Sequence, residues 1–155
     1  MDGWAATVGV TVDGNIDGIG GVDDTLRITA AGAVASRLST NAGNLLTAGK
    51  NNELTFSYYI PSTNAVVKGL RFYNVSATQS ALANTLDAWT TVTLSPTSNT
   101  PSTARLSVYM TTAAGGITGL EAGAGDVIYL KGITTKKLGG TLALEPDGIG
   151  VTDWQ

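Results

Sequence analysis

Residues 12–24, with the sequence VDGNIDGIGGVDD, have the residue types and spacing of a calcium-binding loop. Carboxylate and amide oxygens recur at every second position, as in an EF-hand loop, so the candidate ligands are Asp13, Asn15, Asp17 and Asp24. An EF-hand loop, however, lies between two helices and ends in a bidentate glutamate, whereas this segment joins two strand-like sequences. Two interpretations follow: a calcium site between strands, or a hairpin whose Asp-Gly and Gly-Gly turns favour left-handed backbone.

The composition excludes several other kinds of chemistry. The 155-residue chain contains no cysteine and no histidine, which removes disulfides, thiol nucleophiles, imidazole bases and the usual zinc ligands. The acidic residues form no paired motif of the glycosidase kind, and no serine or threonine has an evident base. We therefore predict that the protein is not an enzyme.

Charge and hydropathy exclude two classes of partner. The net charge is −3, and the nine basic residues are scattered rather than gathered into the stripe that nucleic-acid binding needs. No apolar run approaches the roughly 20 residues that span a bilayer. We expect neither nucleic-acid binding nor membrane insertion.

Alternation of apolar and polar residues runs through most of the chain and predicts β-strands rich in Thr, Val, Ile and Tyr. Clusters of Gly, Pro, Asn and Ser separate eight predicted strands, at 4–12, 25–29, 35–40, 53–60, 65–74, 88–94, 104–110 and 126–137. Only 80–86 suggests even one or two helical turns. This pattern predicts an all-β fold, a two-sheet antiparallel β-sandwich of the jelly-roll type.

The domain organisation follows from where the alternation ends. Residues 1–138 are predicted to form the β-sandwich module. Residues 139–155 begin with a double glycine and contain a further turn, so we interpret them as a linker or as the start of a following domain.

Side chains on successive strand residues point to opposite faces, which separates a core set from an outward set. The predicted core residues are Leu54, Phe56, Tyr58, Ile60, Leu70, Phe72, Leu106, Val108 and Met110. Trp89 is expected to plug the edge of the core at the start of its strand. If the fourth strand lies between the fifth and the seventh, one outward face carries Tyr59, Arg71, Tyr73, Arg105 and Tyr109.

This outward face is the candidate ligand site, with three interpretations. Tyrosine rings stack on the apolar faces of sugars while arginine donates to hydroxyls, which would make the face a glycan site. Tyr and Arg are also enriched at protein interfaces, so the face could pack against sister chains. Cross-strand Tyr and Arg neighbours also stabilise a sheet without any ligand.

The order of the segments LTFSYYI, GLRFYN, AWTTVTL, ARLSVYM and GDVIYLKGITTKKLG resembles the jelly-roll carbohydrate-binding modules of the CBM4/9 type found in bacteriophage tail-fibre and virion proteins. The tryptophan that opens 88–94 and the glycines that run into TLRIT match the same family pattern. The resemblance covers about residues 4–138. It implies a non-catalytic, glycan-binding, receptor-recognition module located in a virion tail or outside the cell.

One departure from the family concerns its structural calcium. Many members bind the ion through an Asp-Asp pair in the last strand, and this chain has Lys131 and Gly132 there. An ammonium at that position opposes a cation, so no cofactor is expected beyond calcium at the acidic loop. Asp126 precedes the matching positions and is expected to cap a loop.

A structural role is the alternative to glycan recognition. In that case the module is an oligomerisation spacer of a virion fibre with no sugar ligand. Its tyrosine-bearing face would pack against sister chains, as in a homotrimer.

Overall fold

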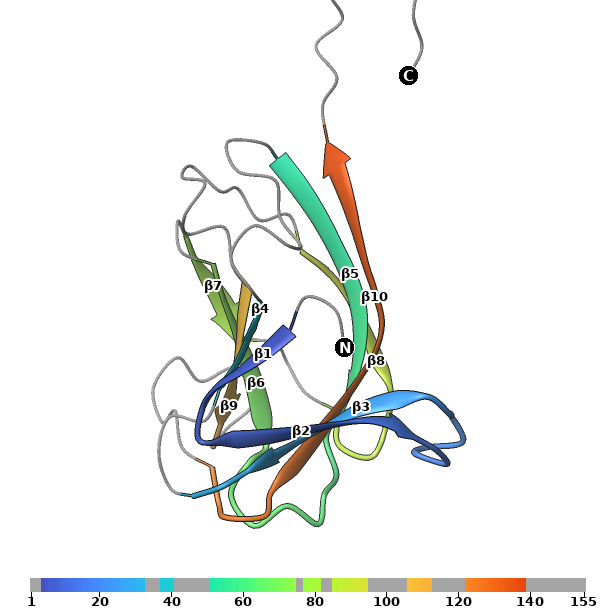
Figure 1. Cartoon of the computed structure of the whole chain (residues 1–155), viewed down its shortest axis with the longest axis vertical. Coiled ribbons are helices and arrows are strands. Elements are labelled where there is room, and N and C mark those ends of the chain that lie inside the picture. The colour runs from blue at the N-terminus through green and yellow to red at the C-terminus, as the bar shows by residue number, and fades with distance from the viewer. Residues whose placement is uncertain are drawn as a thin grey trace, which may run out of the picture.

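The computed structural model describes residues 4–32, 37–40, 51–74, 77–81, 85–94, 106–112 and 122–138. These residues form two five-stranded antiparallel sheets packed face to face and contain no helix (Figure 1). The predicted all-β sandwich is therefore confirmed. No helix in the described residues is long and apolar enough to cross a membrane. Residues 139–155 lie outside the described residues, so the domain boundary at 138 stays a prediction.

Each sheet collects strands from distant parts of the chain. The first sheet has the order β1 (Trp4–Val8), β4 (Arg37–Thr40), β9 (Leu106–Thr111), β6 (Gly69–Asn74) and β7 (Ala77–Ala81). The second sheet has the order β2 (Val10–Ile16), β3 (Thr25–Ala30), β10 (Val127–Leu138), β5 (Asn51–Tyr59) and β8 (Thr90–Leu94). The long strands β5 and β10 pair side by side and bow together on the right of Figure 1.

Ten strands are described where the sequence predicts eight, for two reasons. Gly9 has a φ of 59°, which breaks the predicted strand 4–12 into β1 and β2. Those two strands belong to different sheets, so the glycine carries the chain from one layer to the other. The tenth strand is β7 (Ala77–Ala81), which the sequence pattern did not predict. It pairs antiparallel with β6 and overlaps the first residues of the weak helical pattern at 80–86.

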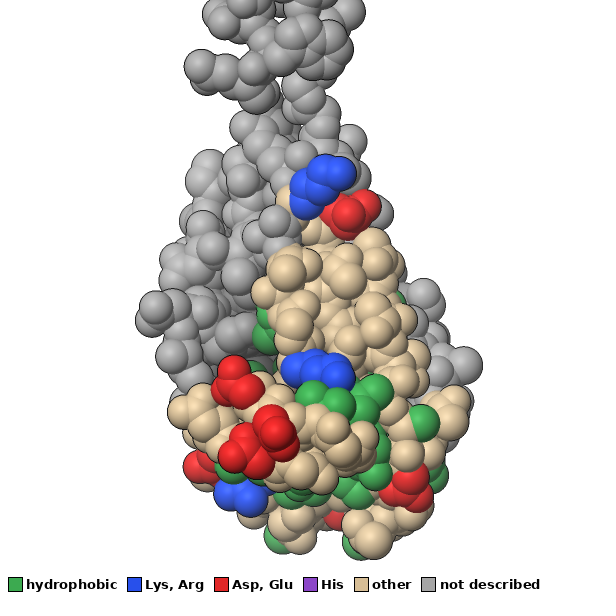
Figure 2. Space-filling model, turned by 90° about the vertical axis from the view of Figure 1, so that its right-hand side faces the viewer, with side chains coloured by type: hydrophobic (Ala, Val, Ile, Leu, Met, Phe, Trp, Pro, Cys, Tyr) green, Lys and Arg blue, Asp and Glu red, His purple; other side chains and the backbone are tan. Residues whose placement is uncertain are grey.

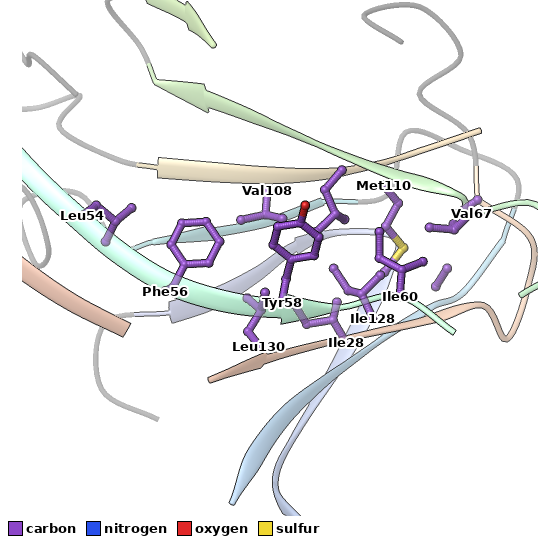
Figure 3. Packing of buried hydrophobic residues seen from close by; sticks show 13 residues of the cluster. Ile28, Leu54, Phe56, Tyr58, Ile60, Val67, Val108, Met110, Ile128 and Leu130 are labelled. Atoms are coloured by element: carbon purple, nitrogen blue, oxygen red, sulfur yellow. The ribbon is translucent and has the colours of Figure 1, made fainter. Parts of the chain in front are cut away.

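The core lies between the two sheets and confirms the predicted alternation. Leu54, Phe56 and Tyr58 of β5 and the following Ile60 are at most 2% exposed, as are Leu70 of β6 and Val108 and Met110 of β9. Figure 3 shows the side chains of Phe56 and Tyr58 lying between the sheets, toward Val108. Each such side chain contributes about 1.5–3 kcal/mol when buried. The side chains of Phe72 and Leu106, also predicted for the core, are outside the described set.

Asp126 fixes the loop between β5 and β6 to the start of β10. Its carboxylate is buried and accepts hydrogen bonds from the backbone N–H groups of Ala65, Val66 and Val67 at 2.7–2.9 Å, and from Gly123 at 3.1 Å. Burial raises the pKa of this carboxyl, but the four donors outweigh burial and hold the pKa below its ordinary value. The expected capping role of Asp126 is confirmed.

Asn64 strengthens the same junction. Its side-chain amide donates to the carbonyl of Val127 at 2.7 Å, and its side-chain oxygen accepts from the Val127 N–H at 2.9 Å. Together with the bonds to Asp126, these two hydrogen bonds satisfy backbone polar groups of a partly buried loop. The loop therefore holds β5 and β10 in a fixed relation, and these two strands carry most of the site described next.

Candidate functional site

The structure divides the predicted ligand residues that it describes between the two sheets. Arg71 of β6 and Tyr109 of β9 are direct cross-strand partners in the first sheet. Tyr73 also lies on β6, opposite Ser107, but its side chain is outside the described set. Arg105 lies outside the described residues.

Tyr59 does not belong with them, and the predicted strand order was wrong on this point. β5 lies between β10 and β8 in the second sheet, not between β6 and β9 in the first. Alternation is the same whichever sheet a strand joins, so it separates inward from outward residues without assigning a strand to a layer. The expected single face is therefore two faces on opposite sides of the molecule.

Tyr59 forms an aromatic platform with two rings that the sequence analysis did not include in the site. Tyr129 of β10 is its cross-strand partner, with ring centroids 6.2 Å apart. Trp89, which directly precedes β8, is tilted against the other side of Tyr59 at 5.6 Å. All three side chains are partly exposed on the outward face of the second sheet. We call Tyr59, Trp89 and Tyr129 the aromatic platform.

Trp89 corrects a second expectation, since it does not plug the edge of the core. Tyr58 points inward and is fully buried, so its neighbour Tyr59 and the ring that packs on Tyr59 lie outside. The indole N–H of Trp89 donates to the carbonyl of Ile19 at 2.9 Å. A tryptophan held by its one polar atom keeps the remaining ring surface available for contacts.

The platform continues as a line of side chains across the whole second sheet. Arg27 of β3 is the cross-strand partner of Tyr129, and Asp13 of β2 is the partner of Arg27. The guanidinium of Arg27 donates to the Asp13 carboxylate at 3.0 Å. Neighbouring strands lie about 4.8 Å apart, so the line from β2 to β8 is roughly 19 Å long.

Two rings of the platform, Tyr59 and Trp89, are held by hydrogen bonds at their rims. The hydroxyl of Tyr59 bonds to the carboxylate of Asp87, which also accepts the backbone N–H of Ser62 at 2.8 Å. The bonds from Ser62 hold the pKa of Asp87 below its ordinary value. Partial burial, and then the charge of Asp87, raise the pKa of Tyr59, which therefore stays a neutral phenol at physiological pH. A ligand that meets these rings does not have to order them first.

The glycine-rich segment between β2 and β3 packs against the side chain of Trp89. Ile19 and Val22 exchange both backbone hydrogen bonds, at 3.0 and 3.1 Å, around a two-residue turn. Gly20 and Gly21 have φ values of 55° and 76°, as a type I′ hairpin turn requires. A Cβ at Gly20 would lie 3.0 Å from Nε1 of Trp89 and 3.1 Å from Cε2 of Tyr59. The turn therefore packs on the platform where only glycine fits.

The geometry of this hairpin gives the calcium hypothesis no support. Asp13 is bound to Arg27, and Asp17 accepts the backbone N–H of Asp24 at 3.0 Å. Asn15 and Asp24 have φ values of 57° and 55°, the left-handed backbone of the hairpin interpretation. Within the part of the chain that the structure describes, no three acidic, His or Cys side chains gather as metal ligands. Calcium binding at these four residues is untested, and the hairpin interpretation predicts that they bind none in solution.

Two rows of hydroxyl groups lie beside the platform on the same face. Ser57 and Thr91 are hydrogen-bonded across β5 and β8 at 2.8 Å, and Thr55 and Thr93 at 2.9 Å. Figure 2 looks onto this side of the molecule: hydrophobic side chains gather in its lower half next to a basic group, and a largely polar surface extends above them. Apolar rings and hydroxyl groups therefore form one continuous surface.

Lys131 of β10 places a positive charge on the platform. Its Nζ lies 4.3 Å from the centroid of the Trp89 ring, within the range of a cation–π interaction. Lys131 is the cross-strand partner of Ser57, so the charge sits where the rings meet the hydroxyl rows. From the sequence, Lys131 was expected only to oppose calcium in the last strand.

Comparison with known proteins adds information on the fold. No family model matches the chain, and no curated protein matches it. Two solved structures from Paenibacillus barcinonensis Xyn10C are similar. They are the CBM22-1 xylan-binding domain (TM-score 0.60, 15% identity, covering 90% of this chain and 88% of that one) and the CBM22-2 xylan-binding domain (0.61, 10%, 88% and 92%). A mutant of a family 29 carbohydrate-binding module is also similar, with a TM-score of 0.51 and 16% identity, covering 87% of this chain and 81% of that one. At these identities the likeness shows a shared β-sandwich fold.

Proposed function

We propose that this protein is a non-catalytic glycan-binding module and that the aromatic platform is its binding site. The observation that carries the proposal is that three neighbouring aromatic rings and two rows of hydroxyl groups lie on one outward face. A pyranose ring has an apolar C–H face that packs on the negative face of an aromatic ring. Its hydroxyl groups then exchange hydrogen bonds with Ser and Thr neighbours.

The structural neighbours support this proposal without carrying it. Two of them are described as xylan-binding domains, and they share the sandwich architecture. A fold by itself hosts many functions, so the argument depends on the site. The described residues bring together no carboxylate pair across a cleft, and we expect no release of reducing ends from polysaccharides by the isolated module.

The proposal extends to the biological setting implied by the sequence resemblance. There the module recognises a glycan of a host surface and belongs to a virion tail or to another extracellular protein. A single open face binds weakly, and several copies on one fibre would compensate through multivalency.

The first test compares variants on the two faces against a polysaccharide panel by isothermal titration calorimetry. Tyr129→Ala removes a ring from the platform and is expected to weaken binding at least tenfold, because truncating a central aromatic contact costs about 2 kcal/mol. Arg71→Ala on the opposite sheet is the matched control and should bind as the wild type does. The reverse result, with binding lost only in Arg71→Ala, would move the site to the first sheet.

The second candidate function is the structural spacer, and the pairing of Arg71 with Tyr109 favours it. These residue types are enriched at protein interfaces, and the two lie side by side on the first sheet. Light scattering distinguishes the candidates. A monomer that binds glycan supports recognition, whereas a trimer that binds none and dissociates on Tyr109→Ala supports the spacer.

A further inference from the structure

Lys131 differs from the other described basic side chains of the second sheet in what surrounds its charge. Arg27 is paired with Asp13 at 3.0 Å, the ion pair found among the described residues. Lys136 lies opposite Glu53 in the register of β10 and β5. Lys131 has an aromatic ring, not a carboxylate, as its charge partner.

The position of this ammonium is defined by the sheet. Lys131 follows Tyr129 by two residues, so both point outward from β10. β5 lies between β10 and β8, so the lysine side chain crosses β5 to bring Nζ over Trp89. The ammonium has three donors and the ring engages one side of it, which leaves donors directed at whatever lies on the platform.

Three carboxylates around the platform accept hydrogen bonds from groups other than Lys131. Asp87 accepts from Ser62 and Tyr59. Asp17 and Asp23 of the hairpin accept the backbone N–H groups of Asp24 and Gly18. In the part of the chain that the structure describes, no ion pair involves Lys131, so its charge can bind an anionic group of a ligand.

We propose that the glycan bound here is acidic, a polysaccharide that contains uronic acid, and that Lys131 binds its carboxylate while the sugar ring stacks on the platform. This inference rests on the proposed function and specifies its ligand class. A neutral sugar offers the ammonium hydroxyl acceptors comparable with the water that it displaces, whereas a carboxylate supplies a stronger, charge-assisted bond. The net charge of −3 repels an anionic polymer at long range. In physiological salt that repulsion is screened beyond about 8 Å, and a contact at the platform is not.

The test uses polygalacturonate, alginate and glucuronoxylan in calorimetry at physiological salt. Each polymer is compared in its ionised form, called the acid below, and as its methyl ester. Esterification removes the charge and leaves the sugar chain unchanged. For the polymer that binds, the acid is expected to bind about tenfold more tightly than its ester. Lys131→Gln should bring the acid to the level of the ester without changing the ester, and Lys131→Arg should retain the preference.

Lys136→Gln is the matched control, since it removes a lysine from the same strand and is expected to retain the preference for the acid. Equal binding of acid and ester by the wild type overturns this inference and leaves glycan binding standing. An equal loss for acid and ester in Lys131→Gln also overturns it, because Lys131 would then only position Trp89. Failure of every polysaccharide, acidic or neutral, overturns the proposed function and this inference with it.

Discussion

At the scale of single residues, the carboxylate of Asp126 accepts the backbone hydrogen bonds of a loop that has no neighbouring strand to accept them. Three consecutive backbone N–H groups, of Ala65, Val66 and Val67, converge on it, and Gly123 adds a fourth. An anion suits this concave set of donors better than a neutral acceptor does. The arrangement is a structural anion site filled by the chain itself.

Replacing Asp126 with Asn tests this role. Asn has one acceptor oxygen, and its NH₂ group would face backbone N–H groups that are themselves donors. We therefore expect the free energy of unfolding to fall by about 2–4 kcal/mol. Urea denaturation measures the change. Asp24→Asn is the control, since Asp24 is exposed and Asn tolerates its left-handed backbone, and it should stay within about 0.5 kcal/mol of the wild type. An equal loss in both variants would contradict the buried-anion account.

Gly20 offers a second test at this scale. Gly20→Ala and Gly21→Ala suffer the same left-handed strain in one turn, but only a Cβ at residue 20 meets Trp89 and Tyr59. We expect Gly20→Ala to alter the near-UV circular dichroism of the aromatic side chains and to weaken glycan binding. Gly21→Ala should lose stability by about 1 kcal/mol with an unchanged spectrum. Identical spectra for the two variants would show that the turn does not support the platform.

At the scale of elements, the β2–β3 hairpin shows why an acidic spacing does not by itself distinguish a metal site from a tight turn. Asp, Asn and Gly are favoured in calcium loops and in tight turns for different reasons, as oxygen ligands in one case and for left-handed backbone in the other. The backbone hydrogen bonds of Ile19 and Val22 and the side chains of Asp17 and Asp23 close this hairpin, as the turn interpretation requires.

The matching prediction is that calcium has no effect on stability. Thermal melts in 1 mM-range calcium and in EDTA are expected to give the same Tm, because an ion that bound only the folded chain would raise it by mass action. A Tm that rises with calcium concentration would restore Asp13, Asn15, Asp17 and Asp24 as ligands.

The sequence predicted which face of a strand each side chain occupies better than it predicted which strands lie next to one another. Leu54, Phe56 and Tyr58 were assigned to the core because period two depends only on the local backbone. The partners of Tyr59 were not found, because strand order depends on crossovers such as the one at Gly9, which leave no period in the sequence. Tyr59 was therefore selected correctly as an outward residue but grouped with residues of the other sheet.

At the scale of the whole molecule, the titration of a few buried groups defines the pH range of stability. The pKa of Asp126 is lower in the folded chain than the ordinary value near 4, so its contribution is complete above that pH and is lost as the pH falls through the folded value. The pKa of Tyr58 is raised by burial, so its contribution is present below about pH 10 and is lost as the pH rises further.

We therefore expect a plateau of stability between about pH 4 and pH 10 with a fall at each side. Calorimetric melts across this range measure it. The acid fall should be smaller in Asp126→Asn, which has no carboxyl to protonate at this site. A wild-type Tm that stays constant down to pH 2 would contradict the assignment of a lowered pKa to Asp126.

The position of β10 also bears on how the chain is made. β10 is the central strand of the second sheet, between β3 and β5, yet it is the last described strand in the sequence. While the ribosome is still translating, the β2–β3 pair and β5 have nothing to join them, and both present open edges of the kind that attract other chains. Closure of the layer must wait until residue 138 has left the exit tunnel, so chaperones that shield strand edges would meet this protein as a late-folding client.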